Sequence, residues 1–517
     1  MSVTDSDVDS VQTPEIVDPE IVDPEVVGPE VVDTESVATR EPLFVDRIQG
    51  IRLFLAFLLL ATVFHLPGLF HQVFNSDEAY LATQAQVLSH GGKLYTDTVD
   101  RKPPIVPYLY LGAFKITGSD NLLSVHVLAI LAHALTATLL AAEARRRYGA
   151  RGALIAGVLY LCACATLYPS DTQAANFEVF MLPLMTAAIV LGNRQRFLSG
   201  GVVASLATLT KQTASTTLLP LAWLAWRWRK WRGLALLAIG LALPIALSAF
   251  IFGAKDFLFW VFTSNGGYLD VGGAFSYVLR EGFANTLMFL VANAALFMLL
   301  PAAWRRRREN LDLWLWAASA AIGVSIGFRF FGHYYLQLLP PLSLLATGPL
   351  VRASRRLVTV AATLVALPLV WFGGAAVATA MVSTPASYHA ISAYIDAHTK
   401  SADRIFVWGH YPEVYWSSDR IPASRFVTTG FLTGHSGGRP ADQVGQDLAV
   451  PGAWKDFLDD MQVHPPALIL DTSPANIRNA ALYPPEAFPQ FASYLYQNYD
   501  KVATVDYIDV YARKRTH

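Results

Sequence analysis

Long apolar runs separated by short polar segments dominate residues 51–381. A helix needs about 20 largely apolar residues to cross a bilayer. On this basis we predict eleven spans, at 51–69, 121–143, 151–168, 177–192, 198–210, 213–226, 233–253, 283–303, 311–328, 334–350 and 357–381. The pattern is that of an α-helical polytopic membrane protein.

Residues 103–118 are the ambiguous segment, because a short apolar run with two leading prolines fits either a short span or a helix in the membrane interface. Basic clusters decide the matter, since cytoplasmic loops are rich in Lys and Arg. If 103–118 does not cross, the clusters at 145–147, 194–196, 227–232, 305–308 and 352–356 all share the side of Arg47 and Arg52. We therefore predict a cytoplasmic amino terminus and an outer carboxyl terminus.

The two ends of the chain depart from the membrane pattern. The first 42 residues carry twelve acids, one base and the repeat PEIVD-PEIVD-PEVVG-PEVVD, which predicts a disordered acidic cytoplasmic tail over 1–45. Residues 384–517 resemble a soluble protein and predict a small extracytoplasmic α/β domain with a partly parallel sheet. Its expected helices lie near 387–399 and 442–461, and its strands at 404–408, 467–470 and 502–511.

Composition agrees with a membrane location, because 15% of the residues are charged against about 25% in soluble proteins. Beyond residue 42 the chain carries 28 acids and 38 bases, and the basic clusters between apolar runs indicate topology rather than a nucleic-acid surface. We expect a multi-pass plasma-membrane protein without a nucleic-acid partner. Cys162 and Cys164 point to different sides of one predicted helix, so they indicate no disulfide, zinc site or redox function.

Ionisable residues gather on the predicted outer face, above all in the first outer loop, residues 70–120. The span centres are nearly free of them, whereas a channel or carrier needs such groups near the midplane. His126 and His133 are the main exceptions, and we interpret both as core histidines with satisfied hydrogen bonds. The chain has no Walker A or Gly-x-Gly-x-x-Gly motif, so ATP-driven transport is unsupported. A donor used on the outer face would have to arrive bound to lipid.

Two short motifs in the first outer loop carry candidate chemistry. Asp77 stands at the start of an apolar helix and could be a helix cap, but the adjacent Glu78 and the position at membrane level favour a chemical role. Asp100-Arg101-Lys102 could be an interfacial anchor, or its two cations could bind a phosphate headgroup.

Three motifs stand out in the first outer loop: Ser76-Asp77-Glu78-Ala79-Tyr80, Gly91-Gly92-Lys93-Leu94-Tyr95 and Asp100-Arg101-Lys102-Pro103-Pro104. With these motifs the loop resembles that of the GT-C polyprenyl-phosphate-sugar glycosyltransferases, such as the glycosyltransferase family 39 protein mannosyltransferases and the lipid A aminoarabinose transferases. Supporting motifs extend the resemblance over about residues 45–515: Asn176-Phe177-Glu178, Lys211-Gln212, Gly332-His333-Tyr334-Tyr335 and Val407-Trp408-Gly409. Protein mannosyltransferases have a His-Pro-Pro-type segment where this chain has Lys102-Pro103-Pro104.

The resemblance implies a catalytic membrane module over 46–383 that moves a sugar from a polyprenyl phosphate to a cell-envelope glycan, glycolipid or protein, with inversion at the anomeric carbon. A carboxylate must take the proton of the acceptor hydroxyl, and the candidates are Asp77 first and Glu78 second. Cations must stabilise the departing phosphate. The candidates are Arg101, Lys102, Lys211, Arg329 and His333, with Lys211 and Arg329 preferred because each ends a predicted span on the outer side.

Substrate binding is expected from Tyr80, Asp100, Glu178 and Tyr334. Glu178 could orient the sugar or a metal, or it could be a buried acid paired with a cation. Whether the site holds a divalent metal ion is left open: carboxylates and His333 could converge on one, although no ligand spacing requires it. No other cofactor is expected. Apart from donor and acceptor, the expected partners are membrane lipids. The rival hypothesis is a lipid-linked-glycan flippase or carrier without catalysis, which would need internal repeats or polar span centres.

The topology predicts which cysteine substitutions an impermeant thiol reagent can reach. Ser89→Cys and Gly118→Cys should be labelled on intact cells, and Gly149→Cys only after permeabilisation, because the first two positions lie on the outer side in the eleven-span arrangement. Labelling of Gly118→Cys from the cytoplasm alone would show that 103–118 crosses the membrane.

Overall fold

The computed structural model describes residues 43–118, 120–265, 275–382, 388–435 and 444–515. Residues 50–517 form one unit, separate from residues 1–49. The membrane region holds α1 (Leu43–Phe64), α2 (Ser76–Ser89), α3 (Ile105–Thr117), α4 (Leu123–Cys164), α5 (Pro169–Thr172), α6 (Phe177–Asn193), α7 (Phe197–Thr210), α8 (Leu218–Phe252), α9 (Ala254–Val261), α11 (Phe275–Ala292), α12 (Ala294–Trp304), α13 (Leu311–Ser325), α14 (Leu339–Val351) and α15 (Arg355–Val382). Most of the predicted acidic tail and the predicted boundary at 383/384 lie outside the described residues.

Helices occupy each of the predicted spans, but few of them are long. Among the described residues, three helical segments are long and apolar enough to cross a membrane, or four if α11 and α12, bent by 79°, count as one. The helix α4 is broken at Gly149, which has a φ of 76°, a conformation that glycine adopts without steric strain. The helix α8 is broken at Lys230, which has a φ of 48°. Each of these two helices therefore holds two predicted spans. A multi-pass membrane fold is clear, and the number eleven stays a prediction.

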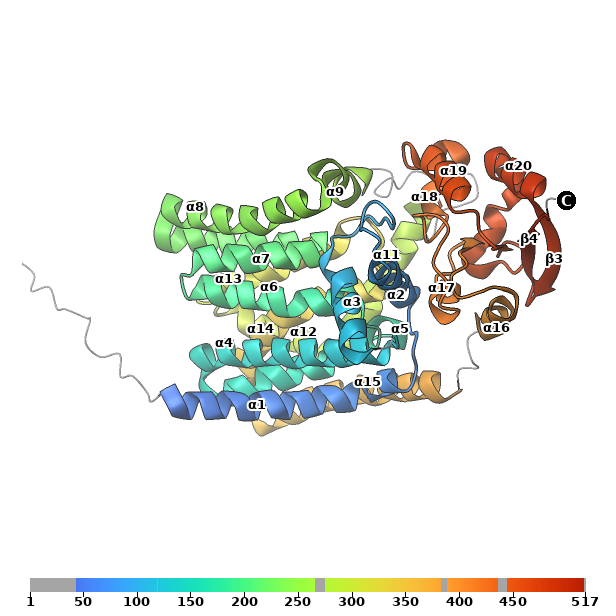
Figure 1. Ribbon diagram of the computed structural model, residues 1–517. Helices are drawn as coiled ribbons and strands as arrows, with labels where there is room; N and C mark the ends of the chain where they lie inside the picture. The colour runs from blue at the N-terminus through green and yellow to red at the C-terminus, as the bar shows by residue number, and fades with distance from the viewer. Residues whose placement is uncertain (1–42, 119, 266–274, 383–387, 436–443, 516–517) are drawn as a thin grey trace, which may run out of the picture. The chain divides into compact units, whose positions relative to one another are not determined.

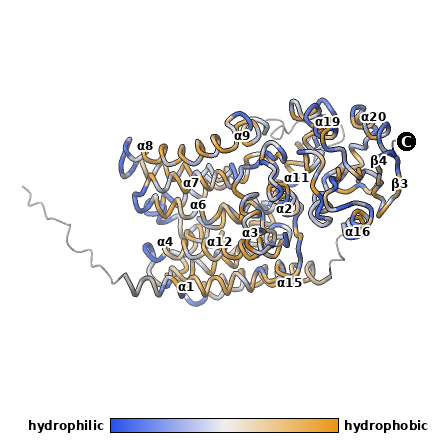
Figure 2. The backbone as a smooth tube through the Cα atoms, in the orientation of Figure 1, coloured by the Kyte–Doolittle hydropathy of each residue, from blue (hydrophilic) through white to orange (hydrophobic). Residues whose placement is uncertain are grey.

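The apolar helices pack side by side (Figure 1). The helix α7 contacts both α6 and α8, and α4 contacts α6 and α14. Figure 2 shows hydrophobic residues along these helices and hydrophilic residues gathered at the turns between them. This distribution matches helices that face lipid and one another along their length, with polar groups kept to their ends.

The ambiguous segment 103–118 contains the helix α3, which is 13 residues long. At about 1.5 Å per residue, such a helix is shorter than the hydrocarbon core. Val106, Tyr110 and Phe114 are buried at helical spacing against α2 and α4, while Tyr108 and Ile116 are exposed. Helices as short as α7 and α14 also fill predicted spans, so length does not decide whether 103–118 crosses the membrane, and its position in the interface stays a prediction.

The carboxyl-terminal residues form a four-stranded sheet with the order β1-β2-β4-β3. Its elements are α16 (Tyr388–His398), β1 (Ile405–Trp408), α17 (Glu413–Ser417), α18 (Gly430–Thr433), α19 (Ala453–Val463), β2 (Leu468–Asp471), α20 (Pro489–Asn498), β3 (Tyr499–Val505) and β4 (Ile508–Arg513). The strands β1 and β2 are parallel and the other pairs antiparallel, as a partly parallel sheet requires. Trp408 stacks on Phe491 at 4.1 Å between ring centroids in the core beside the sheet.

The prediction of one strand over 502–511 is wrong, because this segment is a hairpin of β3 and β4. The chain reverses at Asp506 and Tyr507, which have positive φ values of 49° and 64°. Two-residue hairpin turns usually have Asn, Asp or Gly followed by Gly. Tyr507 stands in place of that glycine, so the segment lacked the usual turn signal. The predicted helix over 442–461 is shorter than expected: its first residues lie outside the described chain, and α19 begins at Ala453.

The carboxyl-terminal residues rest on the first loop. Val99 N–H donates to Arg425 O at 3.1 Å, and Trp416 Nε1 donates to Asp120 O at 3.0 Å. Thr83 Oγ1 lies 3.4 Å from Pro412 O. The sheet-containing segment and the loop therefore lie at the same end of the membrane helices.

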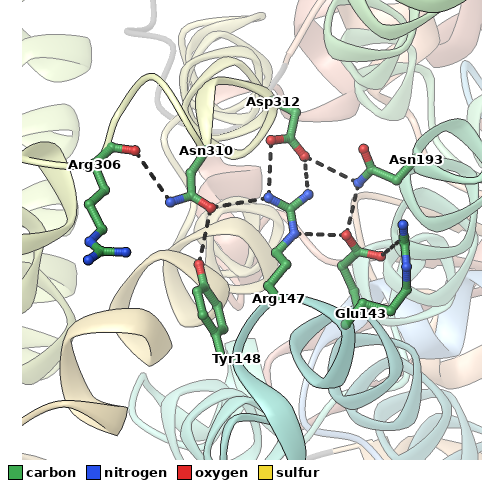
Figure 3. Close-up of polar contacts among 8 residues, drawn as sticks. Glu143, Arg147, Tyr148, Asn193, Arg306, Asn310 and Asp312 are labelled. Carbon is green, nitrogen blue, oxygen red and sulfur yellow. Dashed lines mark hydrogen bonds and ion pairs between the residues drawn. The ribbon is translucent and has the colours of Figure 1, made fainter. Parts of the chain in front are cut away.

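A buried ion network ties the helices together at their other end (Figure 3). Arg147 of α4 donates to Glu143 Oε1 at 2.8 Å and makes two hydrogen bonds to Asp312 of α13. Asn193 of α6 donates to both carboxylates, at 3.1 Å and 3.2 Å. Since Glu143 and Asp312 are buried, their charges depend on Arg147 for compensation.

We predict that Arg147→Met destabilises the folded protein by about 3–5 kcal/mol, because it leaves the buried carboxylate of Asp312 without a cation and that of Glu143 with the half-exposed Arg146 alone. Arg146→Met is the matched control: this side chain is half exposed and pairs with Glu143 alone, so its loss should cost less than about 1 kcal/mol. Thermal denaturation in detergent measures both. Equal losses for the two variants would contradict a structural role of the Arg147 network.

Candidate active site

The helix α2 begins with a capping box. The Asn75 side chain accepts a hydrogen bond from Asp77 N–H at 3.0 Å, and Glu78 Oε2 accepts from Asn75 N–H at 3.1 Å. Reciprocal bonds of this kind satisfy backbone donors that a helix start leaves without partners. Asn75 is the cap, so the alternative interpretation of Asp77 as a cap is wrong.

Glu78 is fully buried and both its oxygens are in use. Oε1 accepts from Ala175 N–H at 2.7 Å and lies 2.7 Å from His126 Nε2, while Oε2 also accepts from Phe74 N–H at 2.8 Å. His126 uses its other nitrogen on Gly68 O, which confirms it as a satisfied core histidine. A carboxylate with four partners is poorly placed to take a proton from a substrate. These contacts favour Glu78 as the anchor of the loop.

Asp77 lies one residue away in a different environment. Its side chain is half-buried, and within the described chain its carboxylate accepts no hydrogen bond. The nearby Asp100 is also half-buried; burial raises its pKa to about 6, the charge of Asp77 adds to the rise, and Lys102 and Arg101 oppose it. Two carboxylates thus share one site, and one of them holds its proton more tightly than usual.

Two tyrosines hold the segment 99–102 beside α2. Tyr80 OH donates to Val99 O at 2.7 Å, and Tyr95 OH donates to Lys102 O at 2.9 Å. Tyr80 is buried, so its hydroxyl stabilises the loop by this hydrogen bond. The predicted substrate contact of Tyr80 is therefore less favoured than a role in positioning Asp100.

Both cations of the first loop lie against aromatic rings. Lys102 Nζ is 5.7 Å from the centroid of Phe177 at the start of α6, and the Arg101 guanidinium is 4.9 Å from that of Phe431 in α18. Gln212 Nε2 donates to Arg101 O at 2.6 Å, which links this segment to the end of α7. Both side chains are half-buried, which leaves part of each within reach of a ligand.

Glu178, Lys211, His333 and Tyr334 come together from three separate stretches of the chain. Lys211 forms a buried ion pair with Glu178, and its Nζ lies 3.9 Å from the Tyr334 ring centroid. His333 Nε2 lies 4.0 Å from Glu178 Oε1. Of the two interpretations of Glu178, the structure thus shows the buried acid paired with a cation.

Asp171 is the member of this cluster that the sequence analysis did not single out. Its Oδ1 accepts from His333 N–H at 2.9 Å and lies 2.8 Å from His333 Nδ1. The approach depends on Gly332, where any side chain would collide with the Asp171 carboxylate. The sequence did mark 169–176 as a polar outer loop, but nothing in it pairs Asp171 with a glycine so far along the chain.

Arg329 stays a prediction. It is buried on the segment that leads into η4 (Gly332–Leu338), between Phe328 and Phe330, whose φ values of 53° and 52° show a constrained backbone. This segment delivers His333 and Tyr334 to the cluster.

Among the described residues, one group of His, Cys and carboxylate side chains has metal-like spacing: His65, His133 and Cys164, with ligand atoms within 4.8 Å of one another. None of these residues belongs to the predicted site. His133 Nε2 has no hydrogen-bond partner within the described chain, so the interpretation of His133 as a satisfied core histidine is wrong.

Comparisons with known proteins address the fold. A family model described as dolichyl-phosphate-mannose-protein mannosyltransferase matches residues 101–252. The structure of ArnT from Cupriavidus metallidurans, bound to undecaprenyl phosphate, matches with a TM-score of 0.61 and 15% identity over 89% of this chain and 97% of that one. The chain has the GT-C glycosyltransferase fold.

A second solved structure agrees. The oligosaccharyltransferase from Archaeoglobus fulgidus in its apo form matches with a TM-score of 0.55 and 11% identity, over 91% of this chain and 75% of that one. No curated protein sequence matches. The GT-C resemblance inferred from the first outer loop is thereby confirmed at the level of the fold.

We predict that Asp100→Asn makes the protein more heat-stable at pH 7.5. The folded pKa of about 6 exceeds the unfolded value of about 4, so the folded state binds the proton more tightly and ionisation of Asp100 lowers stability as pH rises from about 4 to 6. The difference between variant and wild type should shrink on acidification towards pH 4. Melting temperatures in detergent measure it; a variant less stable at pH 7.5 would mean that the cations stabilise the carboxylate overall.

Proposed function

We propose that this chain is a membrane glycosyltransferase that moves a sugar from a polyprenyl-phosphate donor to a hydroxyl of a cell-envelope glycan, glycolipid or protein on the outer face. The observation that carries the proposal is that α2, which has Asp77 in its first turn, holds the segment of Asp100 and Lys102 through Tyr80 OH, which donates to Val99 O at 2.7 Å, in a helix assembly with the GT-C fold. A carboxylate pair next to a cation supplies both things that the reaction needs, a proton acceptor and a counter-charge. The printed ligand of ArnT, undecaprenyl phosphate, supports a lipid carrier as the donor class.

The proposed reaction is a direct displacement at the anomeric carbon. The acceptor oxygen forms the new bond as the sugar–phosphate C–O bond breaks, which inverts the anomeric centre, and the polyprenyl phosphate leaves with the electron pair. Asp77 takes the proton of the acceptor hydroxyl, because its carboxylate is half-buried and has no hydrogen bond within the described chain. Asp100, with its raised pKa, contacts the sugar or acceptor as a hydrogen-bonding partner.

The leaving phosphate gains negative charge, and Lys102 and Arg101 are the groups we assign to it. Both are half-buried beside the carboxylates, where a fixed cation is worth more than in water. Lys211, preferred from the sequence, is buried and neutralised by Glu178, so we assign the pair to holding the site together. His333, fixed by Asp171, and Arg329 remain secondary phosphate candidates.

The rival hypothesis, a carrier without catalysis, is less compatible with where the described charges lie. Charged clusters occur at helix ends, around Glu178 and Lys211 and around Arg147 and Asp312. Chemistry and transport differ in product: a transferase releases polyprenyl monophosphate, and a carrier leaves the donor intact. Mass spectrometry of lipid-linked sugars incubated with the purified protein distinguishes the two.

We predict that Asp77→Asn folds and inserts normally but lowers sugar transfer by about 100-fold or more, the scale expected for loss of a general base. The amide keeps the size of the side chain, and the cap of α2 belongs to Asn75. Asp97→Asn is a matched control in the same loop, where the exposed carboxylate bonds locally to Lys93 N–H; its transfer rate should stay near wild type.

The neighbouring substitution Glu78→Gln tests the division of roles. It should lower the melting temperature, because it disturbs a buried carboxylate with four partners. If Asp77→Asn retained normal transfer while well-folded Glu78→Gln abolished it, Glu78 would be the base. If both remained active, the catalytic role of this loop would be refuted.

A further inference from the structure

Three potential metal ligands meet near one end of α1 and α4, outside the proposed active site. His65 directly follows α1, His133 lies within the first half of α4, and Cys164 is the last residue of α4. All three are buried, with exposed fractions of 5%, 1% and 0%. The trio therefore bridges two helices and the two halves of one of them.

The three side chains lie next to one another. The imidazole rings of His65 and His133 stack at 4.5 Å between centroids, and Cys164 Sγ lies 3.5 Å from His133 Nδ1. One ligand atom from each residue lies within 4.8 Å of the others. Because the two rings are nearly parallel, at 11°, and an imidazole binds an ion in its own plane, one ring has to turn as the three atoms close on a single ion.

Two ring nitrogens of the histidines also lack a partner. In the part of the chain that the structure describes, Nε2 of His65 and Nε2 of His133 are both buried without a hydrogen-bond partner. The other ring nitrogen of His133, Nδ1, is held by Tyr160 OH at 3.0 Å. Metal-bound histidines use their second nitrogen in this way, which orients the ring. Two unpartnered imidazole nitrogens in an apolar interior are costly unless something binds them.

Charge balance selects the ion. A cysteine binds metal as its thiolate, so the trio contributes one negative charge and two neutral imidazoles. A monovalent cation gives a neutral complex, whereas a divalent ion leaves a net positive charge inside the membrane region, where an uncompensated charge is expensive. Thiolate and imidazole together suit soft d10 ions, of which Cu(I) is monovalent.

We propose that His65, His133 and Cys164 form a binding site for a single Cu(I) ion. Binding replaces the thiol proton, which is released to water, and leaves the oxidation state of the metal unchanged. The ion clips the end of α1 to both halves of α4. The proposal is independent of the glycosyltransferase function, because it shares no residue with that site.

The test is a Cu(I) titration of the full-length protein in detergent under anaerobic, reducing conditions, in competition with a chromophoric Cu(I) chelator. Wild type should bind one ion per chain. Cys164→Ser should weaken binding by more than about 100-fold, since losing a ligand costs more than losing one of its outer partners. Cys162→Ser is the matched control, a buried cysteine two residues away that is not in the trio, and should bind as wild type does.

Thermal unfolding with and without Cu(I) guards against a variant that misfolds. The ion should raise the melting temperature of wild type and Cys162→Ser but not of Cys164→Ser. His65→Gln, at the end of a helix rather than within one, gives a second test of the same loss should Cys164→Ser not fold. X-ray absorption at the copper edge should show one sulfur and two nitrogen neighbours.

Three results would overturn the proposal. Copper binding that survives Cys164→Ser and His65→Gln would place the ion elsewhere. Stoichiometric Zn(II) binding to the trio without Cu(I) binding would refute the choice of ion. No binding of either metal by well-folded wild type would remove the site altogether.

Discussion

A buried carboxylate must have its oxygens hydrogen-bonded, and Glu78 meets that requirement by joining parts of the chain that are far apart in sequence. It binds the start of its own helix, His126 of α4 and the backbone of Ala175. The first loop is thereby fixed on the helix assembly with Asp77, the next residue back along the chain, left with its carboxylate out of this network. Asp77, the proposed base, is therefore positioned by Glu78, whose own oxygens are all occupied by hydrogen-bond partners.

The two ends of the helix assembly use charge differently. Around Arg147 each described carboxylate is paired and the contacts serve packing. At the opposite end Lys211 is neutralised by Glu178, and His333 is fixed by Asp171, but Asp77 and Asp100 share a site in which burial and mutual repulsion raise the pKa of Asp100. Perturbed groups of this kind are typical of functional sites.

Much of the fold could be predicted from the sequence, because long apolar runs predict helices and the polar segments between them show where charged residues gather. The positions of the helical segments and of the candidate loop follow from those patterns. The rest depends on contacts between distant residues. No short sequence pattern shows that Glu178 pairs with Lys211 or that Asp171 lies against Gly332. Nor does any pattern show that Cys164, and not Cys162, lies next to two histidines. The hairpin of β3 and β4 was missed because its turn lacks Gly and Asn.

We propose that Lys102 and Arg101 bind the phosphate of the lipid donor beside Asp77. An experimental structure of the protein with a polyprenyl monophosphate tests it most directly. We expect phosphate density within hydrogen-bond distance of the Lys102 amine, on the side of the loop that carries Asp77 and Asp100. Phosphate bound instead at the end marked by Arg147 and Asp312, or well away from Lys102 and Arg101 with the first loop unoccupied, would contradict it.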